Sequence, residues 1–465
     1  MGEEALPWAA PHLVLICFPS QGHVNPTLRL AKRLAAKGLL VTFSSTSDVG
    51  AKITAPTGVE AGGEGVPLGL GRIRLEFLDD HYTEGDDRIR HVQTAGPPAF
   101  AELIRRQEEA GRPVACVVGN PFLPWAVDVA HAAGIPSAVL WVQSCAVFSL
   151  YHHHVHGLVE FPAEDDLDAR VKLPGLPPLS VADLPSFLLP STPFKNLAEA
   201  IMKQVRDIHK ASWVLVNSFS ELERDVLNAL PGMSSPPLIT VGPLVELEED
   251  AVVRGDMLKA SDDCVGWLDE QAPRSVVYAS LGSVVVLSGE DLAEMAHGLA
   301  STGRPFLWVV RPGCSAMLPE GFLSSIAGRG MVVPWSPQEV VLAHPSTACF
   351  LTHCGWNSTL ETLAAGVPVV AFPQWGDQCT DAKYLVEKFK MGVRISAPLR
   401  RDAVRDAVED AVAGPDAGAM VKNARAWSTA AKTALAAGGS SDRHVQAFVD
   451  EVLARSMGAR GEVEL

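Results

Sequence analysis

One stretch of the sequence, from Trp335 to Gln378, concentrates the residues whose types and spacing suit chemistry. The apolar run 347–352 has the composition of a β-strand, and a helix is predicted to begin near Asn357 after a short turn. A second apolar run, 367–372, follows that helix. Strand, turn, helix and strand in this order are typical of a parallel sheet, in which the helix begins at the carboxyl end of a strand. Because the first turn of a helix offers free N–H groups and the positive end of the helix dipole, we expect an anion site there.

The side chains of this stretch suit a nucleotide sugar. Three polar residues accompany the expected anion site: His353, Asn357 and Ser358. Upstream, Trp335 offers a flat face on which a base could stack. After the second strand, Trp375, Asp377 and Gln378 offer an aromatic face, a carboxylate and an amide, which suit the ring and hydroxyls of a sugar.

The same stretch resembles, without a gap, the signature box of the plant secondary-product glycosyltransferases, the UDP-dependent family 1 enzymes. The match includes W-x-P-Q, H-C-G-W-N-S, the central Glu361 and the closing D-Q pair. A lone Trp or His is usually a core residue, but the ordered set indicates this family. The resemblance implies an α/β protein with the GT-B fold, in which two Rossmann-like domains face each other across a cleft. It also implies UDP-glucose as co-substrate.

The resemblance implies a role for each residue of the donor site. Trp335 matches the residue that stacks on uracil, and Gln338 and Glu361 match those that bind the nucleoside, with Glu361 on the ribose hydroxyls. The residues that match pyrophosphate contacts are His353, Asn357 and Ser358. The residues that match sugar contacts are Trp356, Asp377 and Gln378. Ser283, in an earlier strand-end turn, matches a position near the phosphates, although it could also be an ordinary turn serine. The final Gln is usual in enzymes that use glucose, whereas galactose users tend to carry His.

His23 is the candidate for base catalysis. It follows the first predicted strand, 12–18, and we expect the next helix to begin at Pro26 with Asn25 as its cap, which leaves His23 in the turn. Open sheets bind their ligands at such strand ends, and imidazole suits base chemistry near pH 7. A single His at a strand end is more often structural, but the resemblance implies that His23 is the catalytic base.

Asn120 departs from the family pattern, because many members carry at this position an Asp that holds and polarises the His. Asn can orient an imidazole but has no charge to stabilise imidazolium, so we expect His23 to be a weaker base than usual. Asp128 follows about two helical turns later and should point elsewhere. At pH 7 a carboxylic acid with a pKa of about 4 is already ionised, whereas a phenol with a pKa of about 10 is not. The predicted acceptor is therefore a carboxylate, and in-line attack that inverts the anomeric carbon would give a 1-O-acyl-β-glucose ester.

The amino-acid sequences of three further segments agree with an acid acceptor. They resemble the plant branch that glucosylates hydroxycinnamic, hydroxybenzoic and indole acids, and they cover 120–125, 140–145 and 151–158. That branch also contains members that accept phenols. The alternative is therefore an O-glucosyltransferase acting on phenolic hydroxyls of flavonoids or other small phenols. A UDP-sugar-binding protein without turnover should lack His23 or the D-Q pair, and a dehydrogenase or epimerase would need the glycine fingerprint that is missing after the first strand.

A run of histidines raises the question of a metal site. Its members are His152, His153, His154 and His156. Consecutive residues of a helix point in different directions, so these side chains are not expected to converge on one ion. One of them could instead face the acceptor. We therefore predict no metal and no cofactor.

The composition predicts a globular protein of two to three domains. The chain has 465 residues, of which 47% are hydrophobic and 20% charged, and a net charge of −16 with no basic run. Nucleic acid is therefore an unexpected partner. The 8 cysteines are scattered, the sequence has no secretory start, and no run reaches the roughly 18 apolar residues that a membrane-spanning helix needs. We expect reduced thiols, a cytoplasmic location, no membrane contact, a small-molecule acceptor and a monomer.

Turn-rich and acidic residues near the middle of the chain divide it into two α/β halves. We predict an acceptor-binding domain over 1–240, a linker over 241–262 and a UDP-sugar-binding domain over 263–442. The helix within 443–465 is expected, from the resemblance, to pack back on the first domain. The Pro-rich region 157–200 is expected to form loops and short helices on the substrate side.

Overall fold

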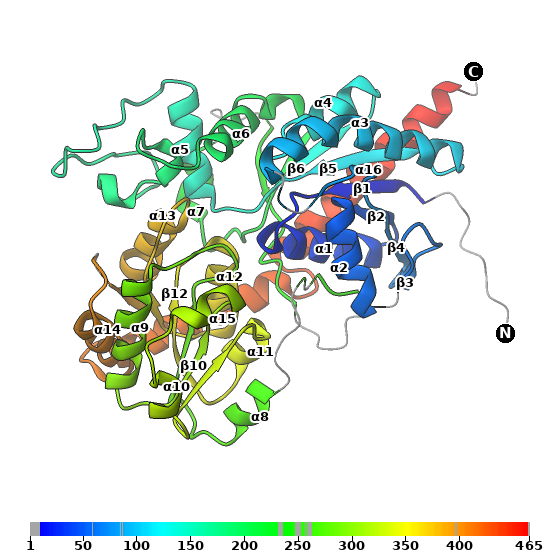
Figure 1. Ribbon diagram of the computed structural model, residues 1–465. Coiled ribbons are helices and arrows are strands. Elements are labelled where there is room, and N and C mark those ends of the chain that lie inside the picture. Colours follow the sequence, from blue (N-terminus) through cyan, green and yellow to red (C-terminus); the bar gives the residue numbers. More distant parts are fainter. Residues whose placement is uncertain are drawn as a thin grey trace. The chain divides into compact units, whose positions relative to one another are not determined.

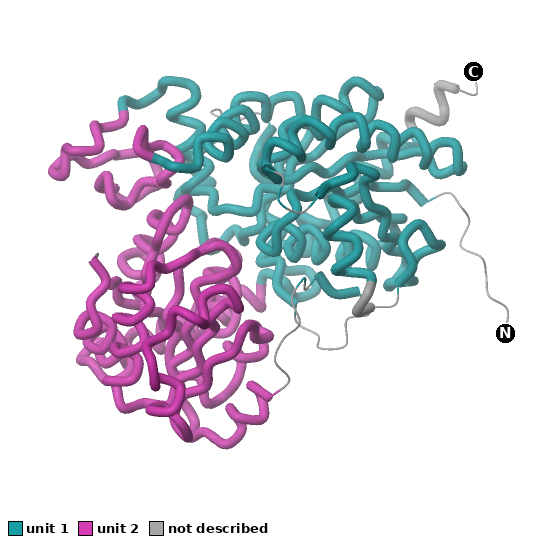
Figure 2. The backbone as a smooth tube through the Cα atoms, viewed as in Figure 1, with its two compact units in different colours: residues 1–160, 192–257, 434–465 teal, residues 161–191, 258–433 magenta. Residues whose placement is uncertain are grey.

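The computed structural model describes residues 10–57, 59–83, 85, 87–230, 236–246, 253–255, 257, 263–395 and 398–463. Much of the predicted linker, 241–262, lies outside these residues. The chain divides into two compact units, coloured separately in Figure 2. Unit 1 comprises 1–160, 192–257 and 434–465, and unit 2 comprises 161–191 and 258–433.

Unit 1 is built on a sheet in which all neighbouring strands are parallel except β3 and β4 (Figure 1). Within the described residues the strand order is β3-β4-β2-β1-β5-β6-β7-β8. The strands are β1 (His12–Ile16), β2 (Leu40–Ser44), β3 (Val66–Leu68), β4 (Gly71–Leu75), β5 (Val114–Gly119), β6 (Ser137–Trp141), β7 (Trp213–Val216) and β8 (Leu238–Thr240). Every residue of β1 is buried, as expected for a central strand covered on both faces.

The topology of this sheet reverses at its centre. The chain begins with β1, moves outward through β2 and β4, and then returns to β5 on the other side of β1. Open α/β sheets bind their ligands at the carboxyl ends of the strands that flank such a switch point. The segments that follow β1 and β5 carry His23 and Asn120.

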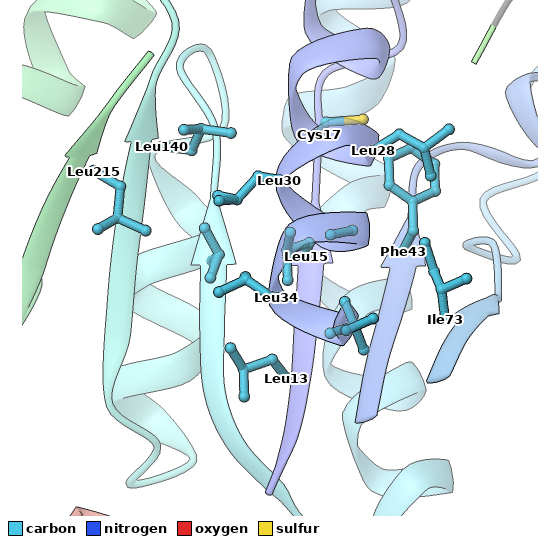
Figure 3. Packing of buried hydrophobic residues seen from close by; sticks show 14 of the residues in the cluster. Leu13, Leu15, Cys17, Leu28, Leu30, Leu34, Phe43, Ile73, Leu140 and Leu215 are labelled. Atoms are coloured by element: carbon cyan, nitrogen blue, oxygen red, sulfur yellow. The ribbon is translucent and has the colours of Figure 1, made fainter. Parts of the chain in front are cut away.

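Helices complete unit 1. They are α1 (Gln21–Ala36), α2 (Ser47–Thr57), α3 (Arg88–Glu109), α4 (Trp125–Ala132), α5 (Cys145–Val155), α6 (Lys195–Arg206), η3 (Ile208–Lys210), α7 (Arg224–Ala229) and α16 (Ser440–Val463). The apolar residues of α1 recur at helical spacing, and Leu28, Leu30 and Leu34 belong to the core cluster that also contains Leu15 and Phe43 of the sheet (Figure 3). Complete burial of one such side chain stabilises the fold by roughly 2 kcal/mol.

Helix α1 begins earlier than predicted. Its N-cap is Ser20 rather than Asn25, and Pro26 lies inside the helix rather than at its first position. The N–H groups of His23 and Val24 donate to the Ser20 carbonyl, each at 2.9 Å, so the first turn closes before the proline. Pro26 then removes only one intrahelical hydrogen bond. His23 therefore lies on the first turn of a helix and not in a free turn.

The last helix, α16, belongs to unit 1. The indole Nε1 of Trp213 donates to Glu451 at 2.6 Å, and the Trp213 ring meets Phe448 edge to face at a centroid distance of 5.2 Å. Near the start of α16, Asp442 pairs with Lys37, the C-cap residue of α1, at 2.7 Å. These contacts join the C-terminal helix to β7 and α1.

Unit 2 is built on a second parallel sheet. Within the described residues the order is β11-β10-β9-β12-β13-β14, again with a switch point at its centre, between β9 and β12. The strands are β9 (Val276–Ser280), β10 (Phe306–Val309), β11 (Gly330–Val333), β12 (Thr347–Thr352), β13 (Val369–Ala371) and β14 (Gly392–Arg394). Alternate residues of β9 enter separate core clusters, with Val277 in one and Tyr278 in the other. The period of two along a strand explains this division.

Helices also complete unit 2, and two that carry predicted donor-site residues, α11 and α13, are short. They are η1 (Val181–Asp183), η2 (Ser186–Leu188), α8 (Asp263–Asp269), α9 (Gly289–Ser301), η4 (Pro312–Met317), α10 (Phe322–Ser325), α11 (Gln338–Ala343), α12 (Trp356–Ala365), α13 (Gln378–Lys383), the π-helical η5 (Tyr384–Lys388), α14 (Arg401–Ala413) and α15 (Ala417–Leu435). Ser288 caps α9, because its hydroxyl accepts the N–H of Asp291 at 3.0 Å. Gly366 ends α12 in a left-handed conformation. No described helix is both long and apolar enough to cross a membrane.

The segment 161–191 belongs to unit 2, although the sequence prediction includes it in the first domain, 1–240. The hydroxyl of Thr380 donates to the Asp183 carbonyl at 2.7 Å, across 197 positions of sequence. Arg394 and Asp183 pair at 2.8 Å. Local sequence carries no signal for such distant contacts, so the prediction followed chain order.

Candidate active site

The predicted pyrophosphate residues gather where β12 ends and α12 begins. Gly355 is the extended N-cap of α12, so Asn357 and Ser358 are the second and third residues of the helix. The N–H groups of this first turn have no acceptor within the helix, and the helix dipole adds positive potential. The geometry is that of an anion site. The side chain of Trp356 is buried, so this residue would contact a sugar through its backbone.

His353 lies against two glycines. A Cβ on Gly282, after β9, would come within 2.7 Å of the His353 ring, and a Cβ on Gly355 within 2.6 Å. Only glycine allows the backbone to approach the imidazole this closely. Burial lowers the pKa of His353 to about 4, so the imidazole is neutral at pH 7. Its Nδ1 is buried without a hydrogen-bond partner among the described residues. A polar ligand at the imidazole would suit such a ring.

A hydrogen-bond network fixes the predicted nucleoside residues. The Nε2 of Gln338 donates to Ser358 at 2.8 Å and to the Glu361 carboxylate at 2.6 Å. The hydroxyl of Tyr278 donates to the Gln338 Oε1 at 3.1 Å. Burial raises the pKa of Tyr278, so this hydroxyl remains a donor. The network joins β9, α11 and α12 and holds Glu361 on a partly exposed side of α12.

Tyr278 was missed by the sequence analysis. Its only sequence signal is a polar hydroxyl in an otherwise apolar strand. Arg311 was missed too, although it donates to the carbonyls of Ser283 and Val285 at 2.7 and 2.8 Å and so shapes the loop that carries Ser283. Both residues support others through long-range contacts, which a local pattern does not reveal.

Apart from Trp356, the predicted sugar residues lie on the loop between β13 and α13 or at the start of α13. Trp375 and Asp377 are partly exposed, and Gln378 is the first, buried residue of α13. The Oε1 of Gln378 accepts the N–H groups of Gln374 at 2.9 Å and of Trp375 at 3.2 Å. Because this oxygen already accepts two backbone N–H groups of the loop, a sugar contact from Gln378 would come from its Nε2. Trp335, ahead of α11, is partly exposed as well.

In unit 1, His23 and Asn120 are brought together by the switch point between β1 and β5. The Nδ1 of His23 and the Oδ1 of Asn120 form a short hydrogen bond. The Nδ2 of Asn120 donates to the Thr27 hydroxyl at 3.4 Å, and that hydroxyl donates to the His23 carbonyl at 2.8 Å. These contacts orient the amide with its oxygen toward the imidazole. The proton then resides on Nδ1, and Nε2 carries the lone pair of a base.

Two aromatic rings enclose His23. The ring centroid of Phe18 lies 5.5 Å from that of His23, and the centroid of Phe122 lies 5.2 Å from it. Phe122 has a φ of 71°, a costly conformation for a bulky residue. Burial lowers the pKa of His23 to about 4, against a smaller opposite effect of the hydrogen bond with Asn120. Burial therefore leaves His23 a weak base, and the neutral amide of Asn120 offsets this effect only in part.

Asp128 does not serve His23. Its carboxylate accepts hydrogen bonds from Lys203 at 3.2 Å and Lys210 at 2.8 Å. The prediction that Asp128 points elsewhere is confirmed. The helical phase decides this result, because α4 places Asp128 on its side toward α6 and η3.

The histidines of α5 point in different directions. His153 is buried and its Nδ1 donates to the Ser149 carbonyl at 2.7 Å, whereas His154 is exposed. His152 is buried against Phe148, with parallel rings 6.0 Å apart. The Nδ1 of His156 donates to the His152 carbonyl at 2.9 Å. Among the described residues, no group of three or more His, Cys, Asp or Glu side chains is placed to hold a metal ion.

Two Rossmann-like units, one with a helix N-terminus that suits an anion and one with a buried His23–Asn120 pair, fit a sugar-nucleotide-dependent transferase. Comparisons with known proteins agree with this class. A family profile described as UDP-glucoronosyl and UDP-glucosyl transferase matches residues 261–420. A gallate 1-beta-glucosyltransferase of Punica granatum is 48% identical over 98% of this chain and 91% of its own length. A cinnamate beta-D-glucosyltransferase of Fragaria ananassa is 47% identical over 97% of this chain and 84% of its own.

Solved structures give the same result. Os79 of O. sativa in complex with UDP is 32% identical, with a TM-score of 0.85 over 95% of this chain and 100% of that chain. TcCGT1 in complex with UDP is 27% identical, with a TM-score of 0.83 over 96% and 100%. The chain belongs to the UDP-glycosyltransferase family and has its GT-B fold, which confirms the predicted family and fold class. It is a hexosyltransferase of the UDP-sugar type.

Proposed function

We propose that this enzyme is an inverting, UDP-glucose-dependent glucosyltransferase that forms 1-O-acyl-β-glucose esters of small aromatic acids. The observation that carries the proposal is the pairing of His23 with the uncharged amide of Asn120 rather than with a carboxylate. The similarity to proteins named for gallate and cinnamate supports it.

The donor would be held by the residues of unit 2. The proposed nucleoside and phosphate ligands are Trp335, Gln338, Glu361, His353, Asn357, Ser358 and Ser283. The proposed sugar ligands are Trp356, Trp375, Asp377 and Gln378. The first turn of α12 and the neutral His353 support the phosphate assignment, because they offer donors without adding a charge that would trap the released UDP.

The reaction would proceed by in-line displacement. A carboxylate oxygen of the acceptor attacks the anomeric carbon of glucose from the face opposite the diphosphate. The new ester C–O bond forms as the bond from the anomeric carbon to the phosphate oxygen breaks, and UDP leaves with the electron pair. Because the acceptor is already ionised, no proton has to be removed.

The pKa of His23 favours this acceptor over a phenol. Transfer of a proton from a phenol with a pKa of about 10 to a base with a pKa of about 4 is uphill by on the order of 8 kcal/mol. A carboxylate acceptor is already ionised and therefore avoids this free-energy cost of proton transfer altogether. A carboxylate in place of Asn120 would reduce the free-energy cost of proton transfer from a phenol to His23. It would also repel an acidic acceptor.

We also propose that the enzyme acts as a monomer in the cytoplasm. The support is its resemblance to plant secondary-product glycosyltransferases and, in the described residues, the lack of a membrane-spanning helix. Light scattering during gel filtration would test the monomer.

Turnover with UDP-glucose tests the acceptor. We would compare cinnamic, benzoic and indole acids with flavonols and simple phenols, and treat each product with mild alkali. Alkali-labile products made mainly from acids are expected, because an ester is cleaved by hydroxide and a phenolic glucoside is not. Alkali-stable products made mainly from phenols would overturn the proposal and favour the O-glucosyltransferase.

A further inference from the structure

The segment 180–188 contacts the loop that carries the proposed sugar ligands. The N–H of Ser186 donates to the Gly376 carbonyl at 3.0 Å, and the Gly376 N–H donates to the Ser186 hydroxyl at 2.7 Å. The ring of Phe187 packs on Trp375, with centroids 5.9 Å apart. Gly376 has a φ of 68°, a left-handed conformation that favours glycine, and lies between Trp375 and Asp377, two of the proposed sugar ligands. The segment therefore fixes the loop at the point where its backbone is most adaptable.

Asp183 fixes the other end of the same loop. It is buried, with 5% of its surface exposed, and its carboxylate accepts a hydrogen bond from Arg394 at 2.8 Å and pairs with Lys383 at 3.3 Å. Its carbonyl accepts the hydroxyl of Thr380, in α13, at 2.7 Å. Since α13 begins with Gln378, these contacts hold the helix that presents Gln378.

The surroundings of the Asp183 carboxylate stabilise its ionised form. The carboxylate also accepts the N–H and the hydroxyl of Ser180, at 3.1 and 2.6 Å. Burial opposes ionisation, but the Ser180 hydrogen bonds and the neighbouring Lys383 and Arg394 hold the pKa of Asp183 below its usual range. Removal of this charge would leave two cations without their shared partner.

A fixed loop matters for the sugar more than for the nucleotide. The contacts of the segment reach Trp375, Gly376 and α13. The proposed uracil, ribose and phosphate ligands lie elsewhere, just before α11, on α11 and α12, and in the turns after β9 and β12. Ligand groups that are already in place bind without the loss of conformational entropy that a mobile loop would incur. The effect of the segment should therefore be confined to the part of the donor that UDP lacks.

We propose that Asp183, Ser186 and Phe187 are positioning residues that hold the loop 375–378 in its sugar-binding geometry, and that they set the affinity and selectivity for the hexose of the donor but not the affinity for UDP. This inference rests on the proposed function, because it takes Trp375, Asp377 and Gln378 as sugar ligands. No local sequence pattern assigns the three positioning residues such a role, since their contacts with the loop arise only in the fold.

The test compares the dissociation constants of UDP and UDP-glucose by calorimetry for the full chain. We expect Ser186→Ala, Phe187→Leu and Asp183→Ala each to weaken UDP-glucose by about fivefold or more while UDP changes by less than about twofold. Discrimination between UDP-glucose and UDP-galactose, measured as the ratio of kcat/KM values, should fall in the same variants. Glu409→Gln is the matched control, because it removes a carboxylate that pairs with Arg304 in the same unit but on α14. It should leave both dissociation constants unchanged.

Each result decides the matter. Equal weakening of UDP and UDP-glucose would mean that the segment only supports the unit, and unchanged constants in all three variants would mean that the loop needs no support; either overturns the inference. If Asp183→Ala fails to fold, Ser186→Ala and Phe187→Leu decide, since they leave the buried ion pairs intact. A wild-type protein that binds UDP but gains nothing from the glucose would overturn the assignment of the sugar ligands itself, which separates the two proposals.

Discussion

The imidazole of His23 lies between two aromatic rings and one amide, and each neighbour affects its pKa in a known direction. Burial against Phe18 and Phe122 disfavours the charged form, and Asn120 offers only a dipole in return. An Asp at position 120 would add a negative charge in contact with Nδ1 and would stabilise imidazolium. We therefore expect a single oxygen-for-nitrogen exchange to change the base strength of His23, and with it the preferred class of acceptor.

The substitution Asn120→Asp tests whether residue 120 sets the base strength of His23 and the preference for the acceptor. The new charge should raise the pKa of His23 by about one to three units. We expect the ratio of kcat/KM for a phenol to that for an aromatic acid to rise by about tenfold or more, because general-base catalysis improves as the base pKa approaches that of the acceptor. Steady-state kinetics with one matched acid and phenol would measure it. An unchanged ratio would contradict the role given to Asn120, and Asp128→Asn, remote from His23, serves as the control.

At the scale of elements, the turns that join strands to helices position the candidate phosphate ligand His353. The turn after β9 and the turn after β12 meet at His353, and each carries a glycine at the point of contact. Gly282 has a φ of 74°, a conformation that β-carbon-bearing residues adopt at a cost of about 1 kcal/mol. The two glycines therefore let both turns approach the His353 ring closely and hold it in place.

Gly282→Ala should displace His353, since the added Cβ would lie 2.7 Å from the ring. We expect UDP to bind about tenfold more weakly, a loss of about 1.4 kcal/mol. Gly321→Ala is a matched control, because Gly321 has a φ of 73° in the same unit, but a Cβ there would meet no described atom within 4 Å. Calorimetric titration with UDP measures both variants. Similar affinities for the two would show that backbone strain, and not the contact with His353, causes any loss.

At the scale of the whole molecule, buried histidines couple stability to pH. His12 lies in β1 with its Nδ1 2.9 Å from the Arg112 carbonyl and its Nε2 2.8 Å from the Thr42 hydroxyl. Burial lowers the pKa of His12 to about 4, with a smaller raising effect from the hydrogen bond to Arg112. The unfolded chain, with an ordinary pKa near 6.5, binds the proton more strongly. Stability from this group is therefore complete above about pH 6.5 and is lost as the pH falls toward about 4.

His12→Gln should flatten this dependence. For the wild-type protein we expect His12 alone to lower the free energy of unfolding by at most about 2 kcal/mol between pH 7.5 and pH 5. Urea unfolding at the two pH values, followed by circular dichroism, would measure the difference for each variant. The loss between the two pH values should shrink in His12→Gln. His209→Gln, an exposed position on η3, should show the wild-type loss, and an equal loss in His12→Gln would contradict the prediction.

The family, the fold class and central strands such as β12 could be predicted without the structure. Strand β12 was predicted at its observed bounds, because a short apolar run between turns has few alternatives. The signature from Trp335 to Gln378 is contiguous, so its residues keep their order and spacing in any fold that forms them. The start of α1 was misplaced by five residues, since Pro26 satisfied a local rule that the Ser20 cap overrides.

Contacts between distant residues could not be predicted from the sequence. His23 and Asn120 are 97 positions apart and come together because the sheet reverses between β1 and β5. Tyr278 reaches Gln338 across 60 positions, and Asp183 reaches Arg394 across 211, which moves the segment 161–191 into unit 2. The physical reason is that local propensity fixes dihedral angles within a few residues, whereas these contacts follow from strand order and from the packing of helices on the sheets.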